Sequence, residues 1–73
     1  MGGTVRNVVQ CVCLEELRQV IRQYRPLGLF LAREGRRWTA VDNTTGQAWT
    51  ETFAHRRHAL LWLSGQVEAQ LCQ

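Results

Sequence analysis

The feature that most constrains this fold is a turn between two runs of strand-forming residues. The Asn-Thr-Thr-Gly sequence of residues 43–46 separates residues 37–42 from residues 48–53, and both runs contain Trp and Thr. Gly46 is suited to the left-handed conformation that closes a four-residue hairpin loop. We therefore expect an antiparallel β-hairpin over residues 38–53.

A third run of strand formers, residues 29–33, precedes the hairpin, and Glu34-Gly35 supplies the turn between them. The sequence therefore predicts a three-stranded antiparallel meander. With Asp42 facing Gln47, the register fixes the other cross-strand pairs. These are Ala40 with Trp49, Trp38 with Glu51, and Leu31 with Trp38.

Alternation of side chains places most large apolar residues of the meander on one face. We expect this face to pack against the helices and to bury its tryptophans; it carries Leu29, Leu31, Trp38, Ala40, Trp49 and Phe53. The opposite face is richer in threonine and carries Phe30, Thr39, Val41, Thr50 and Thr52. On that face, Phe30, Thr39 and Thr50 are the exposed candidate platform for stacking a nucleic-acid base.

Two helices are expected to flank the meander. Residues 14–24 carry apolar side chains at spacings of three and four, and Arg25-Pro26 ends this pattern. Residues 55–63 form the second helix, followed by a Ser-Gly stop. Residues 8–12 are rich in valine and are read as an extended segment or short strand. The predicted fold class is α+β, with the order helix, three strands, helix and a short extra N-terminal strand.

Cys13 directly precedes the first helix. It is expected either to cap that helix, with Glu16 reaching back to it, or to be a thiol activated by the helix terminus. A reactive thiol needs partner groups that the sequence does not place. The chain also lacks a glycine-rich phosphate loop, a serine motif and a periodic pair of carboxylates, so we predict that it is not an enzyme.

The length of 73 residues predicts a single domain without a deep cleft. Residues 1–4 are expected to be loose, and residues 66–73 to form a second short helix or a partner-binding tail. So small a core makes a homodimer a further expectation. An odd number of cysteines, Cys11, Cys13 and Cys72, without an apolar leader indicates reduced thiols and a cytoplasmic protein. No apolar run reaches the roughly 18 residues of a membrane helix.

The sharpest departure from local rules is the run His55, Arg56, Arg57 and His58 in the first turn of the last helix. Cations are unfavourable there, whereas an anion is attracted by the free N–H groups and the helix dipole. We therefore predict an anion or nucleic-acid site at these four residues together with Arg36 and Arg37 at the hairpin base. The alternative is that the arginines are solvated or paired with Glu51 or Glu68.

All nine basic residues are arginines, against six acidic residues, which gives a net charge of +3. An all-arginine set suits a phosphate or carboxylate partner, although arginine-favouring codon usage and an ordinary solubility charge are the simpler explanation. Cys11, Cys13, His55 and His58 add up to the ligand number of a zinc site. Their spacings are shorter than such sites use, so we predict no metal and no cofactor.

The element order, with Arg56 and Arg57 at the start of the last helix and Ala59 following, resembles the double-stranded-RNA-binding domain. The Trp49-x-x-x-Phe53 hairpin followed by a helix that contains Ala59 resembles the DNA-binding modules of the plant AP2 and phage-integrase amino-terminal type. Those modules read DNA with an exposed sheet face. Both resemblances cover under half of the chain, and the sequence assigns no family.

Two functions are therefore expected. The first is a small binding module for an anionic partner, either nucleic acid or an acidic protein surface, to which Arg18 and Arg22 are further candidates. The second is a protein-interaction or homo-oligomeric subunit without a nucleic-acid role. Its contacts would come from residues 8–12, the threonine-rich sheet face or residues 67–71.

Overall fold

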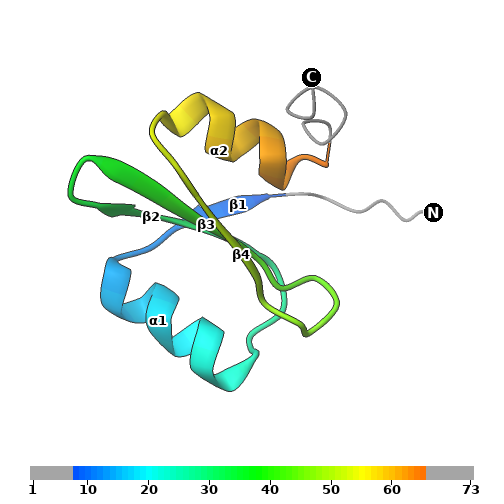
Figure 1. Cartoon of the computed structure of the whole chain (residues 1–73). Coiled ribbons are helices and arrows are strands. Elements are labelled where there is room, and N and C mark those ends of the chain that lie inside the picture. The colour runs from blue at the N-terminus through cyan, green and yellow to red at the C-terminus, as the bar shows by residue number, and fades with distance from the viewer. Residues whose placement is uncertain (1–7, 66–73) are drawn as a thin grey trace.

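A computed structural model describes residues 8–65 of the chain (Figure 1). The loose segment expected at residues 1–4 and the tail expected at residues 66–73 lie outside the described residues. The elements follow in the order β1 (Val9–Cys11), α1 (Leu14–Gln23), β2 (Leu29–Glu34), β3 (Arg37–Asp42), β4 (Trp49–Phe53) and α2 (Arg56–Leu63). Within residues 8–65, each predicted helix and strand is present, and its ends differ from the prediction by one residue at most.

Helix α1 begins and ends at the residues that its sequence favours. The backbone N–H of Cys13 donates to Glu16 Oε1 at 3.4 Å, so Glu16 reaches back as expected of a capping box. At the other end, Tyr24 takes a left-handed conformation, with φ of 59°, and its N–H donates to the Val20 carbonyl. Leu17 and Val20 are the side chains that α1 buries.

The four strands form one sheet in the order β1-β2-β3-β4. Strands β2, β3 and β4 are the antiparallel meander, while β1 adds a parallel strand beside β2. The fold is therefore α+β, as predicted, and the extra N-terminal strand is present. None of the helices in this described range has the length and apolar character needed to cross a membrane.

The register of the meander differs from the prediction by two residues. Asp42 pairs with Trp49, not with Gln47, so residues 43–48 form the loop. The cause is Asn43, which is completely buried: its Oδ1 accepts from the Ala48 N–H at 3.0 Å, and its Nδ2 donates to the Pro26 carbonyl at 2.8 Å. Gly46 is left-handed as expected, and Ala48 also has a positive φ, of 49°.

The remaining pairs shift in the same way. Leu31 pairs with Ala40, while Trp38 lies between Arg33 and Phe53. Because side chains alternate with a period of two, a shift of two leaves each residue on its predicted face.

The two helices cover opposite faces of the sheet, which corrects the expectation that both pack on one face (Figure 1). Helix α1 packs on the face predicted to be open, where Phe30 is 2% and Thr39 is 6% exposed. The base-stacking platform predicted at Phe30, Thr39 and Thr50 is therefore wrong, because α1 buries two of its three members.

Helix α2 packs on the other face, against Leu29, Leu31 and Ala40, with Trp38 and Phe53 partly buried beside them. This much agrees with the predicted apolar face. Trp49 differs from the prediction, because it is 60% exposed. It lies at the start of β4, an edge strand of the sheet. The prediction that all the tryptophans of this face are buried is wrong for Trp49.

Candidate functional site

The topology brings the two predicted arginine pairs to one end of the sheet. Arg36 lies in the two-residue turn between β2 and β3, and Arg37 is the first residue of β3. Strand β4 runs back along β3, so that Phe53 pairs with Trp38 and the chain enters α2 beside this turn (Figure 1). Arg56 and Arg57, the first residues of α2, consequently lie at the same end as Arg36 and Arg37.

Trp38 connects the hairpin to α2 at this end. The guanidinium carbon of Arg56 lies 5.9 Å from the centre of the Trp38 ring, and that of Arg33 lies 5.8 Å from it. Contacts of a guanidinium with an indole ring contribute roughly 0.5–1 kcal/mol at exposed sites. The half-buried Trp38 therefore makes weak contacts with arginines from two different elements.

Arg33 was not among the predicted site residues. Its strand places it on the same face as Leu29 and Leu31, directly opposite Trp38 in the pairing of β2 with β3. The alternation in residues 29–33 already indicates the face on which Arg33 lies. Its position beside Trp38 follows only from the correct register of β2 and β3. We call the set Arg33, Arg36, Arg37, Arg56 and Arg57 the basic end.

The arginines of the basic end are not neutralised within the described part of the chain. Among residues 8–65, the ion pairs are Arg18 with Glu34 at 4.0 Å and Arg22 with Glu15 at 3.9 Å. Glu34 is the strand partner of Arg37, but its carboxylate pairs with Arg18 and accepts from the Thr39 hydroxyl at 2.9 Å. The predicted alternative of a pair with Glu51 does not occur, and Glu68 lies outside the described residues.

Arg18 and Arg22, the further candidates, lie on α1, on the opposite side of the sheet from α2. Both take part in the ion pairs just described. The structure therefore does not bring them into the basic end, although the pair of Arg18 with Glu34 lies close to it.

The start of α2 is open to an anion. His55, the residue before the helix, provides no side-chain hydrogen bond to cap it, and the first turn contains no acidic residue. The first helical hydrogen bonds are donated by His58 and Ala59 to the His55 carbonyl. The N–H groups of Arg56 and Arg57 precede these bonds, so they are available to a negatively charged ligand.

The two histidines lie beside each other at this end, with ring centres 5.4 Å apart in an edge-to-face arrangement. Cys11 and Cys13 are exposed free thiols near β1, at the opposite edge of the sheet from β4. The four residues that add up to a zinc set therefore do not come together. Within residues 8–65, no group of three or more His, Cys, Asp or Glu side chains is placed to hold a metal ion.

The resemblances noted in the sequence agree with the structure in element order only. The parallel strand β1 adds a β-α-β unit that the order helix, three strands, helix does not contain. Helices cover both faces of the sheet over β2 and β3, so within residues 8–65 only β4 keeps an exposed surface that could read DNA. A comparison of the chain with known protein families, curated proteins and solved structures found no match.

Proposed function

We propose that this chain is a small non-enzymatic module that binds nucleic acid through the basic end. The observation that carries the proposal is that five arginines at one end have no ion-pair partner within residues 8–65. Uncompensated guanidinium groups favour phosphate oxygens, to which they donate paired hydrogen bonds.

The spread of the arginines favours a chain of phosphates over a single anion. They come from β2, the adjoining turn, β3 and α2, and Trp38 joins the hairpin to α2 through Arg33 and Arg56. A nucleic-acid backbone supplies repeated phosphates that can meet several arginines at once. His55 and His58 flank this surface and complete the proposed contact set.

The test is the salt dependence of binding to fluorescently labelled single-stranded RNA, double-stranded RNA and duplex DNA, measured by anisotropy. Each arginine engaged with duplex DNA contributes about 0.9 to the slope of log K against log salt, so five give a slope of about −4.5. Absence of binding to all three at low salt would refute the proposal.

Variants identify the surface. Replacing both Arg56 and Arg57 by glutamine is expected to weaken binding and to reduce the slope by about 1.8 for duplex DNA. The matched control is the double variant Arg22→Gln, Arg25→Gln, which removes the same charge from the end of α1. Equal loss in the two double variants would show that net charge alone, rather than the basic end, governs binding.

A second candidate function is self-association, which is favoured by the outer edge of β4. No strand pairs with that edge within residues 8–65, so its backbone groups are open to another strand. Two copies joined through β4 would form a continuous sheet and a homodimer. Sedimentation that returns only the monomer mass at high protein concentration would remove this candidate.

Location in the cytoplasm is part of the proposal. Cys11 and Cys13 are exposed and unpaired, as is common for proteins of a reducing compartment.

A further inference from the structure

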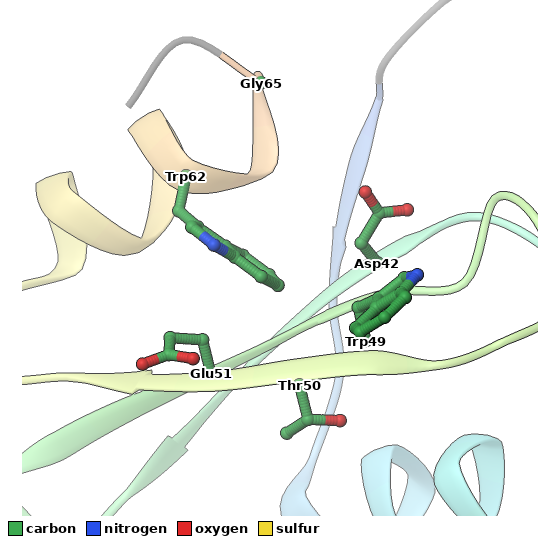
Figure 2. Close-up of a pocket in the computed structure, with 6 residues that line it drawn as sticks. All are labelled: Asp42, Trp49, Thr50, Glu51, Trp62 and Gly65. Carbon is green, nitrogen blue, oxygen red and sulfur yellow. The ribbon is translucent and has the colours of Figure 1, made fainter. Parts of the chain in front are cut away.

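A hollow lies on the α2 side of the sheet, at the opposite end of α2 from the basic end (Figure 2). Its volume is about 510 Å³, which lies within the range of roughly 300–1,000 Å³ of ligand sites. We call it the tryptophan hollow; it is lined by Asp42, Trp49, Thr50, Glu51, Trp62 and Gly65.

Two tryptophans from different elements form its walls. Trp62 extends from α2 toward the sheet, and Trp49 lies across from it on β4 (Figure 2). The ring of Trp62 is supported by Phe53, with ring centres 5.9 Å apart, whereas Trp49 is 60% exposed. The face of an indole ring carries negative potential and attracts cations. The walls therefore suit a flat or cationic group better than an anion.

The charges of the tryptophan hollow also favour a cation. Asp42 and Glu51 line it, and Glu51 forms no ion pair with any described residue. Asp42 Oδ1 accepts from the N–H and hydroxyl of Thr44, but Oδ2 accepts nothing from residues 8–65. Helix α2 also ends at the tryptophan hollow, and its last turn contains no basic residue. No cationic side chain of that turn therefore offsets the negative end of the helix dipole.

We propose that the tryptophan hollow binds an arginine side chain presented by a segment of a partner protein. A guanidinium is flat enough to stack on indole and has donors for two carboxylates, a combination that an ammonium group lacks. The chain already uses this chemistry where Arg33 and Arg56 lie over Trp38. The hollow is larger than one side chain requires, which suits an arginine within a peptide over a free small cation.

The probe is a capped pentapeptide with one arginine between glycines, titrated into the ¹⁵N-labelled full chain. The chain has three tryptophans, so its three indole N–H signals report separately on the two ends of α2. Saturable shifts of the Trp49 and Trp62 signals, with Trp38 unchanged, are the expected result. Shifts of the Trp38 signal alone would overturn the proposal.

Neutral and ammonium peptides test the chemistry. The same peptide with citrulline, which has the shape of arginine without its charge, is expected to bind roughly tenfold more weakly, as is the lysine peptide. Equal binding of citrulline would overturn the assignment of a cation site, and equal binding of lysine would overturn the assignment to guanidinium.

Variants test the residues. Glu51→Gln and Asp42→Asn each keep the shape of the side chain, and Asp42→Asn retains an acceptor for Thr44. Each is expected to weaken arginine binding roughly fivefold to tenfold. Glu15→Gln is the control, because it removes an exposed acid from α1 on the other side of the sheet. Equal effects of Glu51→Gln and Glu15→Gln would refute the site.

A second copy of this chain would also supply arginines. If dilution of the protein alone moves the Trp49 and Trp62 signals, and Arg57→Gln abolishes this effect, the occupant is another copy and the proposal of a separate partner is wrong. None of these measurements involves nucleic acid, so they stand whether or not the basic end binds it.

Discussion

Asn43 is the side chain on which the loop between β3 and β4 depends. Its amide bonds to the Pro26 carbonyl and to the Ala48 N–H join the two ends of this loop to the chain before β2. Its backbone also exchanges hydrogen bonds with Gly28. Asn43→Ala is expected to lower the free energy of unfolding by about 1–3 kcal/mol, because it leaves the partners of the buried amide unsatisfied. Urea denaturation followed by circular dichroism measures this loss.

Thr45→Ala in the same loop is the matched control. Thr45 is exposed, and its replacement is expected to change the free energy of unfolding by less than about 0.5 kcal/mol. A loss for Asn43→Ala as small as that of the control would mean that water replaces the Asn43 amide at little cost.

At the scale of the element, α2 has the reverse of the charges that stabilise a helix by itself. Arg56 and Arg57 occupy its first turn, and its last turn contains no cation. Arg57→Glu is therefore expected to raise the free energy of unfolding by about 0.3–1 kcal/mol, since a carboxylate at this position interacts favourably with the helix dipole. For so short a chain, this corresponds to a rise in Tm of roughly 1–8 °C by calorimetry.

The same variant is expected to bind nucleic acid more weakly, so stability and binding change in opposite directions. Arg22→Glu in the last turn of α1 is the control with the opposite sign, because Arg22 is favourably placed at that helix end and pairs with Glu15. If Arg57→Glu destabilises the protein instead, Arg57 contributes to the fold through a contact that its exposure does not suggest.

The extent of each element could be predicted from the sequence, but the pairing between elements could not. Apolar spacing and Pro26 determine the ends of α1, and the glycines mark the turns, because these effects act within a few residues. The register depends on the burial of Asn43, an asparagine that is equally common in an exposed turn. A local pattern does not distinguish these two environments.

At the scale of the whole molecule, the sheet separates two apolar clusters. One is formed by α1 with Phe30, Ala32 and Val41, and the other by α2 with Leu29, Leu31 and Ala40. Val20→Ala in the first cluster is expected to cost about 2 kcal/mol, and Leu63→Val in the second about 1 kcal/mol. Because the sheet lies between them, the double variant is expected to show the sum of the two losses within about 0.5 kcal/mol.

Denaturant unfolding of the two single variants and the double variant measures this additivity. A deviation above about 1 kcal/mol would show that strain passes through β2 and β3 from one cluster to the other. The measurement also tests whether both clusters unfold in one transition, as expected of clusters that share these strands.

The placement of α1 explains why part of the candidate site was missed. A helix that connects two adjacent parallel strands crosses over the sheet with a fixed hand, and this hand decides which face it covers. Predicting that α1 buries Phe30 therefore required knowing that β1 pairs with β2. Arg56 and Arg57 were accessible to local reasoning, whereas Arg33 and the tryptophan hollow depend on long-range pairing.

The charges at the two ends of α2 also form an electric dipole along this helix. The arginines add positive charge at the start of α2 and the carboxylates of Asp42 and Glu51 add negative charge near its end, so both reinforce the helix dipole. The eight residues of α2 separate these charges by about 12 Å. In the field of a polyanion, these charges favour orientations in which the start of α2 faces the polyanion and Trp49 and Trp62 face away from it.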